Sequence, residues 1–216
     1  MRLSYNRTIP WEVEQSEFMR LTQRQDAIIV GSLLGDGCLE RNGRNVRLRL
    51  EHGKDQKSYL VWKFKELKSV ITGSVMKVHA YHKMSNRFYD SYRAYTFSNE
   101  AMQSYQDRFY LNSKKIIPGN ICELLKNPLS LAVWFMDDGY KRSDCNAFRL
   151  GTDSFNLEEQ KLLQNVLKMN FGIETKMHKK GKYWNIYIPE RESKKFVRII
   201  KPHIIPKLKY KIALTP

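Results

Sequence analysis

The sequence has few cysteines and no long hydrophobic run. Its three cysteines, Cys38, Cys122 and Cys145, are scattered over 216 residues and form no CxxC pair, so we expect neither a disulfide framework nor a zinc site. The longest apolar run, residues 27–35, is far shorter than the roughly 20 residues of a membrane span. The N-terminus contains no apolar stretch typical of a signal peptide. We therefore expect an intracellular protein with no membrane partner.

Acidic residues are scarce relative to basic ones. The chain has 22 Asp and Glu against 38 Lys and Arg, a net charge of +16. A folded chain this basic repels itself, which favours a function beside a polyanion. Nucleic acid, an anionic membrane and a ribosomal site all qualify. Hydrophobic residues make up 42% of the chain, so we expect a globular protein, either one large domain or two small ones that share an interface.

The chain contains two copies of one pattern. Residues 29–37 read IVGSLLGDG and residues 131–139 read LAVWFMDDG, and both are apolar helical runs that stop at Asp-Gly. After each run we expect the same order of elements, which are a strand (46–51, 147–151), a helix (55–71, 156–169), a hairpin (75–97, 174–188), a helix (99–110, 191–200) and an Ile-Ile-Pro (116–118, 204–206). This order is similar to αββαββα, and we expect an α+β fold of two αββαββα repeats related by a pseudo-twofold axis. The repeats span residues 22–120 and 121–216, after an N-terminal extension, 1–21.

The two apolar runs have clear helix boundaries. Thr22 and Gln25 form a capping box, and Asn127 precedes Pro128 at the start of the second run. We expect Gly37 and Gly139 to end the helices. In the first helix, Gly31 and Gly35 share one face, where small residues allow a second backbone to approach closely.

The acids at the helix ends break a rule. Asp36 and Asp138 face the negative end of a helix dipole, which is locally unfavourable. One such residue is ordinary, but two at matching places in two repeats indicate that a cation binds there. Two buried helices without a site remain the simplest structural interpretation of the runs themselves.

The two motifs resemble those of the LAGLIDADG homing endonucleases. The tracts NPLSLAVWFMDDG, KKIIPGN and IIKPHIIPKLKYKI are especially similar to the branch of the yeast mitochondrial omega-intron endonuclease. The resemblance implies a saddle of two antiparallel sheets with the motif helices side by side at its centre. It also implies a site-specific enzyme that makes a staggered double-strand break at a long, non-palindromic DNA target.

The resemblance implies catalytic roles for four residues. Asp36 and Asp138 would hold the metal, and Lys115 and Lys211 would each lie near one scissile phosphate. Asp137 would be a neighbour that makes a local hydrogen bond. Val133 and Asp137 stand where the family has small residues, so we expect a looser approach of the second helix there.

Carboxylates are hard oxygen ligands, which favours Mg²⁺ or Mn²⁺ as the cofactor. The five histidines are dispersed without metal-ligand spacing, and we expect each to be a surface or packed imidazole; they are His52, His79, His82, His178 and His203.

The DNA-binding surface is expected on the sheets. Residues 46–51, VRLRLE, alternate between apolar and polar side chains, as a half-buried strand does. Basic, amide and aromatic side chains on such strands and their loops can bind phosphates and base edges. The expected contacts are Arg41, Asn42, Arg44, Arg47, Arg49, Lys77, His79, Tyr81, Lys83, Arg87, Arg93, Lys141, Arg142, Arg149, Lys180, Lys182, Asn185 and Tyr187.

Other functions remain open. An RNA-binding intron maturase would use the same fold without needing the acids, so the presence of Asp36 and Asp138 favours the nuclease. A transcription regulator would need an added helix-turn-helix, and an intein would need terminal splicing residues, so we expect neither. We therefore expect a monomer that binds double-stranded DNA, and its host intron RNA if it also assists splicing. Such a protein would act in an organelle, such as a mitochondrion or chloroplast, or in a prokaryotic cytoplasm.

Overall fold

The computed structural model describes residues 21–181 and 183–215. Residues 1–20 of the expected N-terminal extension and the expected DNA contact Lys182 therefore lie outside the described residues. Within the described residues, no helix is both long and apolar enough to cross a bilayer. The three cysteines are free.

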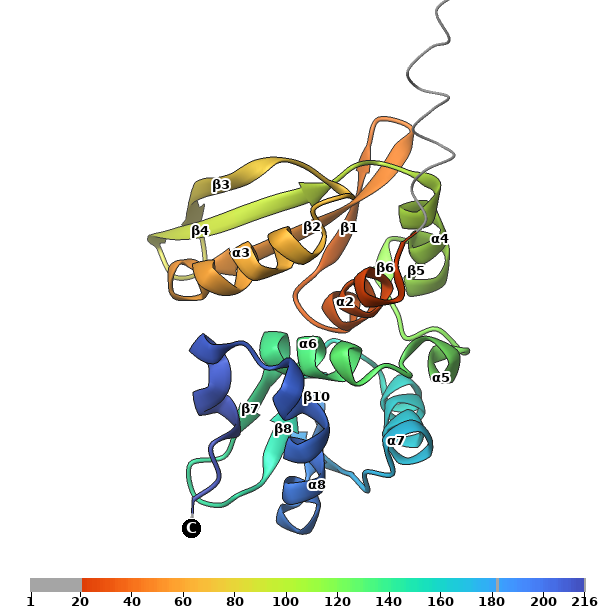
Figure 1. The fold of residues 1–216 in the computed structure, drawn as a ribbon, viewed down its shortest axis with the longest axis vertical. Helices are drawn as coiled ribbons and strands as arrows, with labels where there is room; N and C mark the ends of the chain where they lie inside the picture. Colours follow the sequence, from red (N-terminus) through yellow and green to blue (C-terminus); the bar gives the residue numbers. More distant parts are fainter. Residues whose placement is uncertain (1–20, 182, 216) are drawn as a thin grey trace, which may run out of the picture.

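The chain forms two copies of the order αββαββα, as the sequence predicts (Figure 1). The first copy comprises α2 (Gln23–Leu34), β1 (Cys38–Asn42), β2 (Asn45–Gly53), α3 (Lys57–Glu66), β3 (Ile71–His82), β4 (Arg87–Thr96) and α4 (Glu100–Phe109). The second comprises α6 (Pro128–Asp138), β7 (Gly139–Lys141), β8 (Phe148–Leu150), α7 (Leu157–Phe171), β9 (Lys176–Lys180), β10 (Tyr183–Ile188) and α8 (Glu190–Ile200). We call these copies the first and second halves.

Short elements join and extend the two halves. The strands β5 (Tyr110–Leu111) and β6 (Lys114–Lys115) and the helix α5 (Ile121–Leu124) lie between them. The 3-10 helices are η1 (Lys54–Gln56), η2 (Lys201–His203) and η3 (Pro206–Ile212).

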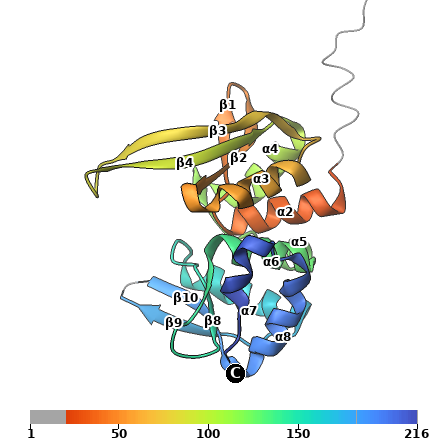
Figure 2. The ribbon, with the colours of Figure 1, turned by 60° about the vertical axis from the view of Figure 1, so that its left-hand side comes forward.

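Each half contains one four-stranded antiparallel sheet, and the two sheets have equivalent strand orders. The order is β1-β2-β4-β3 in the first and β7-β8-β10-β9 in the second. The helices α2 and α6 face each other between the halves, while the hairpin β3–β4 extends well beyond β1 and β2, the other two strands of its sheet (Figure 2). The predicted fold class, with its two central motif helices, is confirmed.

Local sequence signals account for most boundaries. Thr22 and Gln25 form the expected capping box of α2, and Asn127 caps α6 with Pro128 in its first turn. The helix expected over 55–71 is shorter, because a 3-10 turn precedes it and α3 ends at Glu66. The β-branched residues Ile71 and Thr72 instead begin β3, as their strand propensity favours.

The two motif helices lie in close contact. A Cβ placed on Gly31 would lie 2.5 Å from the Ser130 carbonyl oxygen, and one on Gly35 would lie 2.5 Å from the Asp137 Cβ. The looser approach expected at Val133 and Asp137 is therefore wrong, because each of these larger residues faces a glycine of α2. The glycines thus compensate for the departure from small residues in the second motif.

Candidate active site

Asp36 and Asp138 occupy matching ends of the motif helices. Asp138 is the last residue of α6, and Gly139 follows it as the cap. Asp36 lies just beyond α2, which ends at Leu34 with Gly35 as its cap. Gly37 is therefore not the C′ glycine that we expected. A glycine is needed there for space, because an added Cβ would lie 2.8 Å from the Ser32 carbonyl oxygen.

The acids crowd one another electrostatically. Burial, and then the charges of Asp36 and Asp137, raise the pKa of Asp138 to about 7. Burial and the charge of Asp137 also raise the pKa of Asp36, although nearby lysines oppose this. The raised pKa values of Asp36 and Asp138 mean that their deprotonated forms are disfavoured here, and a bound cation would stabilise these forms.

The two predicted lysines reach the same place from the ends of their own halves. The Lys115 Nζ donates to the carbonyl oxygens of Gly35 at 2.9 Å and Gly37 at 2.7 Å. The Lys211 Nζ donates to the Met136 carbonyl oxygen at 2.7 Å. Each lysine therefore binds carbonyl groups that the end of a motif helix leaves unpaired. Burial lowers the pKa of both lysines.

Asp137 is a central residue of the site. From the sequence we expected it only to make a local hydrogen bond. Its side chain is fully buried and accepts from the Lys63 Nζ, at 2.8 Å and 2.9 Å to its two oxygens. It also accepts from the backbone N–H of Asp36 at 3.2 Å. The expectation of a local contact is wrong, because its partners are 74 and 101 residues away in sequence.

Lys63 gave no functional signal in the sequence, because a lysine on an amphipathic helix is usually a surface residue. Its side chain is instead fully buried and lies over the ring of Tyr59, 4.6 Å from the ring centroid. The only available signal was at Asp137, an acid at a position where the motif family has a small residue.

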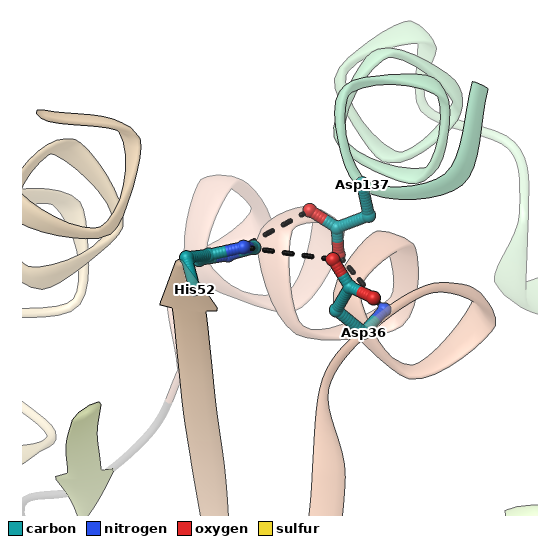
Figure 3. Close-up of side chains that lie close together, drawn as sticks. All are labelled: Asp36, His52 and Asp137. Carbon is teal, nitrogen blue, oxygen red and sulfur yellow. Dashed lines mark hydrogen bonds and ion pairs between the residues drawn. The ribbon is translucent and has the colours of Figure 1, made fainter. Parts of the chain in front are cut away.

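His52 lies beside the acids (Figure 3). It is a packed imidazole, as expected, but its Nδ1 is 3.1 Å from the Gln56 Oε1 and 3.5 Å from the Asp36 Oδ2. Its Nε2 is buried without a hydrogen-bond partner, 3.9 Å from the Asp137 Oδ1. Burial, and then the charge of Lys63, lower the pKa of His52 to about 4. The imidazole is therefore neutral at pH 7.

His52, Asp36 and Asp137 each offer one ligand atom within 4.8 Å of the others. Sequence spacing could not reveal this group, because the three residues come from β2 and from the ends of two different helices. Both Asp137 oxygens, however, already accept from the Lys63 ammonium. Asp36, whose side chain is 40% exposed, is the member of the group that remains open to a ligand.

The first sheet has one face that carries α3 and one that does not. Residues directly opposite each other in antiparallel strands point to the same face. Arg49 pairs with Tyr95, and Glu51 pairs with Arg93, so these four share the face away from α3, which we call the first open face. Arg47 binds Glu40 there at 2.6 Å and lies over the Tyr95 ring, while Arg93 binds Glu51 at 2.8 Å.

Three residues expected at the binding surface lie on the other face. Lys77 pairs with Tyr92 and His79 with Asp90, and Tyr92 pairs in turn with the buried His52. Tyr81 continues this phase. The pairing is irregular between Thr72 and Met76, so simple alternation along β3 did not reveal the face. Lys77, His79 and Tyr81 are exposed, as expected, but they are not part of the first open face.

The second sheet has a similar open face. Arg149 pairs with Tyr140 on one side and with Tyr187 on the other, so all three point the same way. Asn185 shares this phase, but its side chain is buried and its Nδ2 donates to the Asp153 Oδ1 at 3.1 Å. The expected exposure of Asn185 is therefore wrong, because the folded chain buries this residue although it shares the phase of Arg149 and Tyr187.

The other expected DNA contacts lie on loops or strand ends. Arg41, Asn42, Arg44, Lys83 and Arg87 are exposed, and Lys141 and Arg142 are half-buried. Lys180 is in β9. Arg142 already pairs with Asp144, so DNA phosphates would compete with this acid.

The two acids lie at the ends of paired helices, between two antiparallel sheets whose open faces carry arginines. Residues 26–196 match the model of the LAGLIDADG DNA endonuclease family, and the chain belongs to this family. It is 30% identical to the DNA endonuclease I-ChuI of Chlamydomonas applanata, over 90% of this chain and 97% of that protein. It is 28% identical to the cytochrome b mRNA maturase bI2 of Debaryomyces hansenii, over 86% of this chain and 72% of that protein.

A solved structure has the same fold. The homing endonuclease I-WcaI, bound to its DNA recognition sequence, matches with a TM-score of 0.86 and 25% identity, over 99% of this chain and 97% of that chain.

Proposed function

We propose that this protein is a single-chain homing endonuclease that makes a staggered double-strand break at a long, non-palindromic DNA site. Mg²⁺ or Mn²⁺ would be its cofactor. The observation that carries the proposal is the convergence of Asp36 and Asp138 from the ends of two paired helices, where the pKa of each is raised. Two electrostatically crowded carboxylates at one place fit a divalent cation better than they fit a purely structural role.

The donor set suits a hard cation. Asp36 and Asp138 supply carboxylate oxygens, the ligands that Mg²⁺ and Mn²⁺ prefer. Asp137 is already neutralised by Lys63, so we assign the metal to the other two acids. When bound, such a cation activates water and neutralises charge on the reacting phosphate.

Lys115 and Lys211 would stabilise negative charge as it develops on the phosphate. An ammonium group has three N–H donors. Lys115 uses two of them and Lys211 uses one for the helix-end carbonyls, which leaves at least one donor on each for the DNA. The carbonyl contacts would hold each Nζ in place before the substrate arrives.

The two open faces would bind the duplex. Arg47, Arg49 and Arg93 on the first face and Arg149 on the second can contact phosphates or guanine edges. The ion pairs with Glu40 and Glu51 would hold the guanidinium groups in fixed orientations. Because the two halves differ in sequence, they would recognise unlike half-sites, which fits a monomer on a non-palindromic target.

A second candidate function is assistance of intron splicing. The observation that favours it is the similarity to a cytochrome b mRNA maturase. Splicing assistance would not require the paired acids, so their presence makes the nuclease the primary proposal. The two activities are compatible in one protein.

The test has two steps. A target is first selected from a randomised DNA library, and its cleavage by the purified protein in Mg²⁺ is then measured. We expect a staggered break, and we expect Asp36→Asn and Asp138→Asn to abolish it while DNA binding in Ca²⁺ persists. Arg198→Gln, on the exposed side of α8, serves as the control and should cut normally. Cleavage at the wild-type rate by the double Asn variant would refute the assignment.

A further inference from the structure

We propose that Asp137 is a positioning residue, fixed by the buried Lys63, that holds Asp36 in place across the interface between the two halves. The inference rests on the proposed function only in taking Asp36 as a ligand of the reactive metal. The positioning itself concerns the backbone of Asp36 and can be tested without any cleavage.

Asp36 needs an external support that Asp138 does not need. Asp138 belongs to the last turn of α6. Asp36 lies beyond the end of α2, where Gly35 N–H and Gly37 N–H still donate to carbonyls of the helix. The N–H of Asp36 between them donates instead to the Asp137 Oδ2. A carboxylate from the second half thus replaces the missing helix contact at the residue that carries the first acid.

Lys63 fixes the orientation of the Asp137 carboxylate. Its Nζ binds both oxygens, and neither side chain is exposed to solvent. Burying two charges is costly, and a buried ion pair often contributes little net stability. Its contribution here is to geometry, because Lys63 belongs to the first half and Asp137 to the second. The pair sets the position of the end of α6 relative to α3 and to Asp36.

The arrangement is one-sided. The residue of the first motif that corresponds to Asp137 is Gly35, its seventh residue, so no matching carboxylate supports Asp138. Among the described residues, Asp138 makes a backbone contact to Gly151 but its carboxylate has no hydrogen-bond partner. Loss of the pair should therefore affect Asp36 first.

The test compares two double variants in which both charges are removed. Lys63→Met fills the buried slot with a flexible apolar side chain, which avoids an unpaired buried charge. In the first double variant, Lys63→Met is combined with Asp137→Asn, whose amide oxygen can still accept from the Asp36 N–H. We call this the acceptor variant. The new amide nitrogen would then lie near the His52 Nε2, which has no partner now. In the second double variant, Lys63→Met is combined with Asp137→Leu, which is similar in shape to Asp but has no acceptor oxygen. We call this the apolar variant.

The first readout is hydrogen exchange at the Asp36 amide, measured by NMR in the absence of DNA. We expect the acceptor variant to keep protection within about threefold of the wild type, and the apolar variant to raise the exchange rate at least tenfold. The second readout is single-turnover cleavage of the selected target at saturating DNA. We expect the acceptor variant to cleave at close to the wild-type rate and the apolar variant to cleave more slowly. The dissociation constant for DNA in Ca²⁺ should be unchanged in both.

Arg24→Gln with Glu66→Gln is the matched control. It removes an ion pair of 2.6 Å that joins α2 to α3 within the first half and lies away from the acids, and it should change neither readout. If the apolar variant does not fold, Lys63→Met with Asp137→Ala replaces it, because a small residue at this position is what the motif family has.

Equal exchange and equal cleavage in the acceptor and apolar variants would overturn the proposal, whether both are fast or both are slow. If the exchange result holds but the wild type cuts no DNA, the proposed nuclease function fails while the positioning role stands.

Discussion

Gly31 of α2 lies directly against Val133 of α6, so that a Cβ on the glycine would lie 2.7 Å from the Cβ of the valine. The Ser130 carbonyl oxygen would be closer still, at 2.5 Å. A backbone atom cannot move aside as a flexible side chain can, so this contact fixes the distance between the two motif helices. The distance between the acids at their ends depends on it.

Gly31→Ala should therefore destabilise the protein by about 1–3 kcal/mol, the usual cost of overpacking. This loss should occur although alanine is the better helix former. Gly53→Ala, where an added Cβ meets nothing within 4 Å, is the matched control and should change stability by less than about 0.5 kcal/mol. Urea unfolding measures both. Equal stability of the two variants would contradict a rigid contact between the helices.

Lys115→Met and Lys211→Met should each slow the cleavage of one strand. Each lysine contacts the end of a different motif helix, so each should stand beside one scissile phosphate. Losing a donor to developing charge costs about 2.7–4 kcal/mol in comparable sites. A supercoiled plasmid that carries the target should accumulate as nicked circles, with opposite strands cut in the two variants. Slowing of both strands to the same degree would show that the lysines do not serve separate phosphates.

DNA affinity should fall steeply with salt, because the protein carries a net charge of +16 and binding releases counterions. If Arg49 and Arg93 each neutralise one phosphate, replacing either with Gln should reduce the log–log slope by about 0.9. Lys77→Gln should leave the slope unchanged, because Lys77 lies on the face that carries α3. Fluorescence anisotropy at several salt concentrations gives the slopes. If Lys77→Gln reduced the slope as much as Arg49→Gln does, the DNA interface would include the face of the β3–β4 hairpin that carries Lys77.

Asp138 should make the metal-free protein less stable as pH rises. Its pKa is about 7 in the folded protein and about 3.9 when unfolded, so the folded state binds more protons in this window. The stabilisation is complete below pH ~4 and is lost as pH rises through about 7. At pH 8, Asp138→Asn should therefore be more stable than the wild type by about 1–3 kcal/mol, after discounting for solvent screening.

Urea unfolding in EDTA at pH 5 and pH 8 measures this difference. The change in protonation of His52 is common to both proteins and cancels in the comparison. Added Mg²⁺ should reduce the advantage of the variant, because the wild type binds it in the folded state. An advantage of the same size at both pH values would argue against a raised pKa of Asp138.

The sequence alone determined the features that local patterns encode. The repeat of IVGSLLGDG and LAVWFMDDG gave the two central helices, and the capping residues Thr22 and Asn127 gave their starts. Alternation in VRLRLE correctly predicted the buried and open sides of β2. These signals depend on residues a few positions apart, so they can be interpreted without knowledge of the fold. The convergence of Asp36 and Asp138 needed the resemblance of the two motifs to a known family.

Only the tertiary structure decided which polar side chains are buried together. Lys63 and Asp137 are 74 residues apart, and nothing local to either indicates the other. The face of Lys77 depends on an irregular register with β4. Asn185 is buried, and its amide donates to Asp153, which lies 32 residues away. Hydrophobic periodicity reports only whether a position is covered, because burial of apolar area is not directional. A buried ion pair or hydrogen bond requires particular atoms at particular distances, and the folded chain alone brings those atoms together.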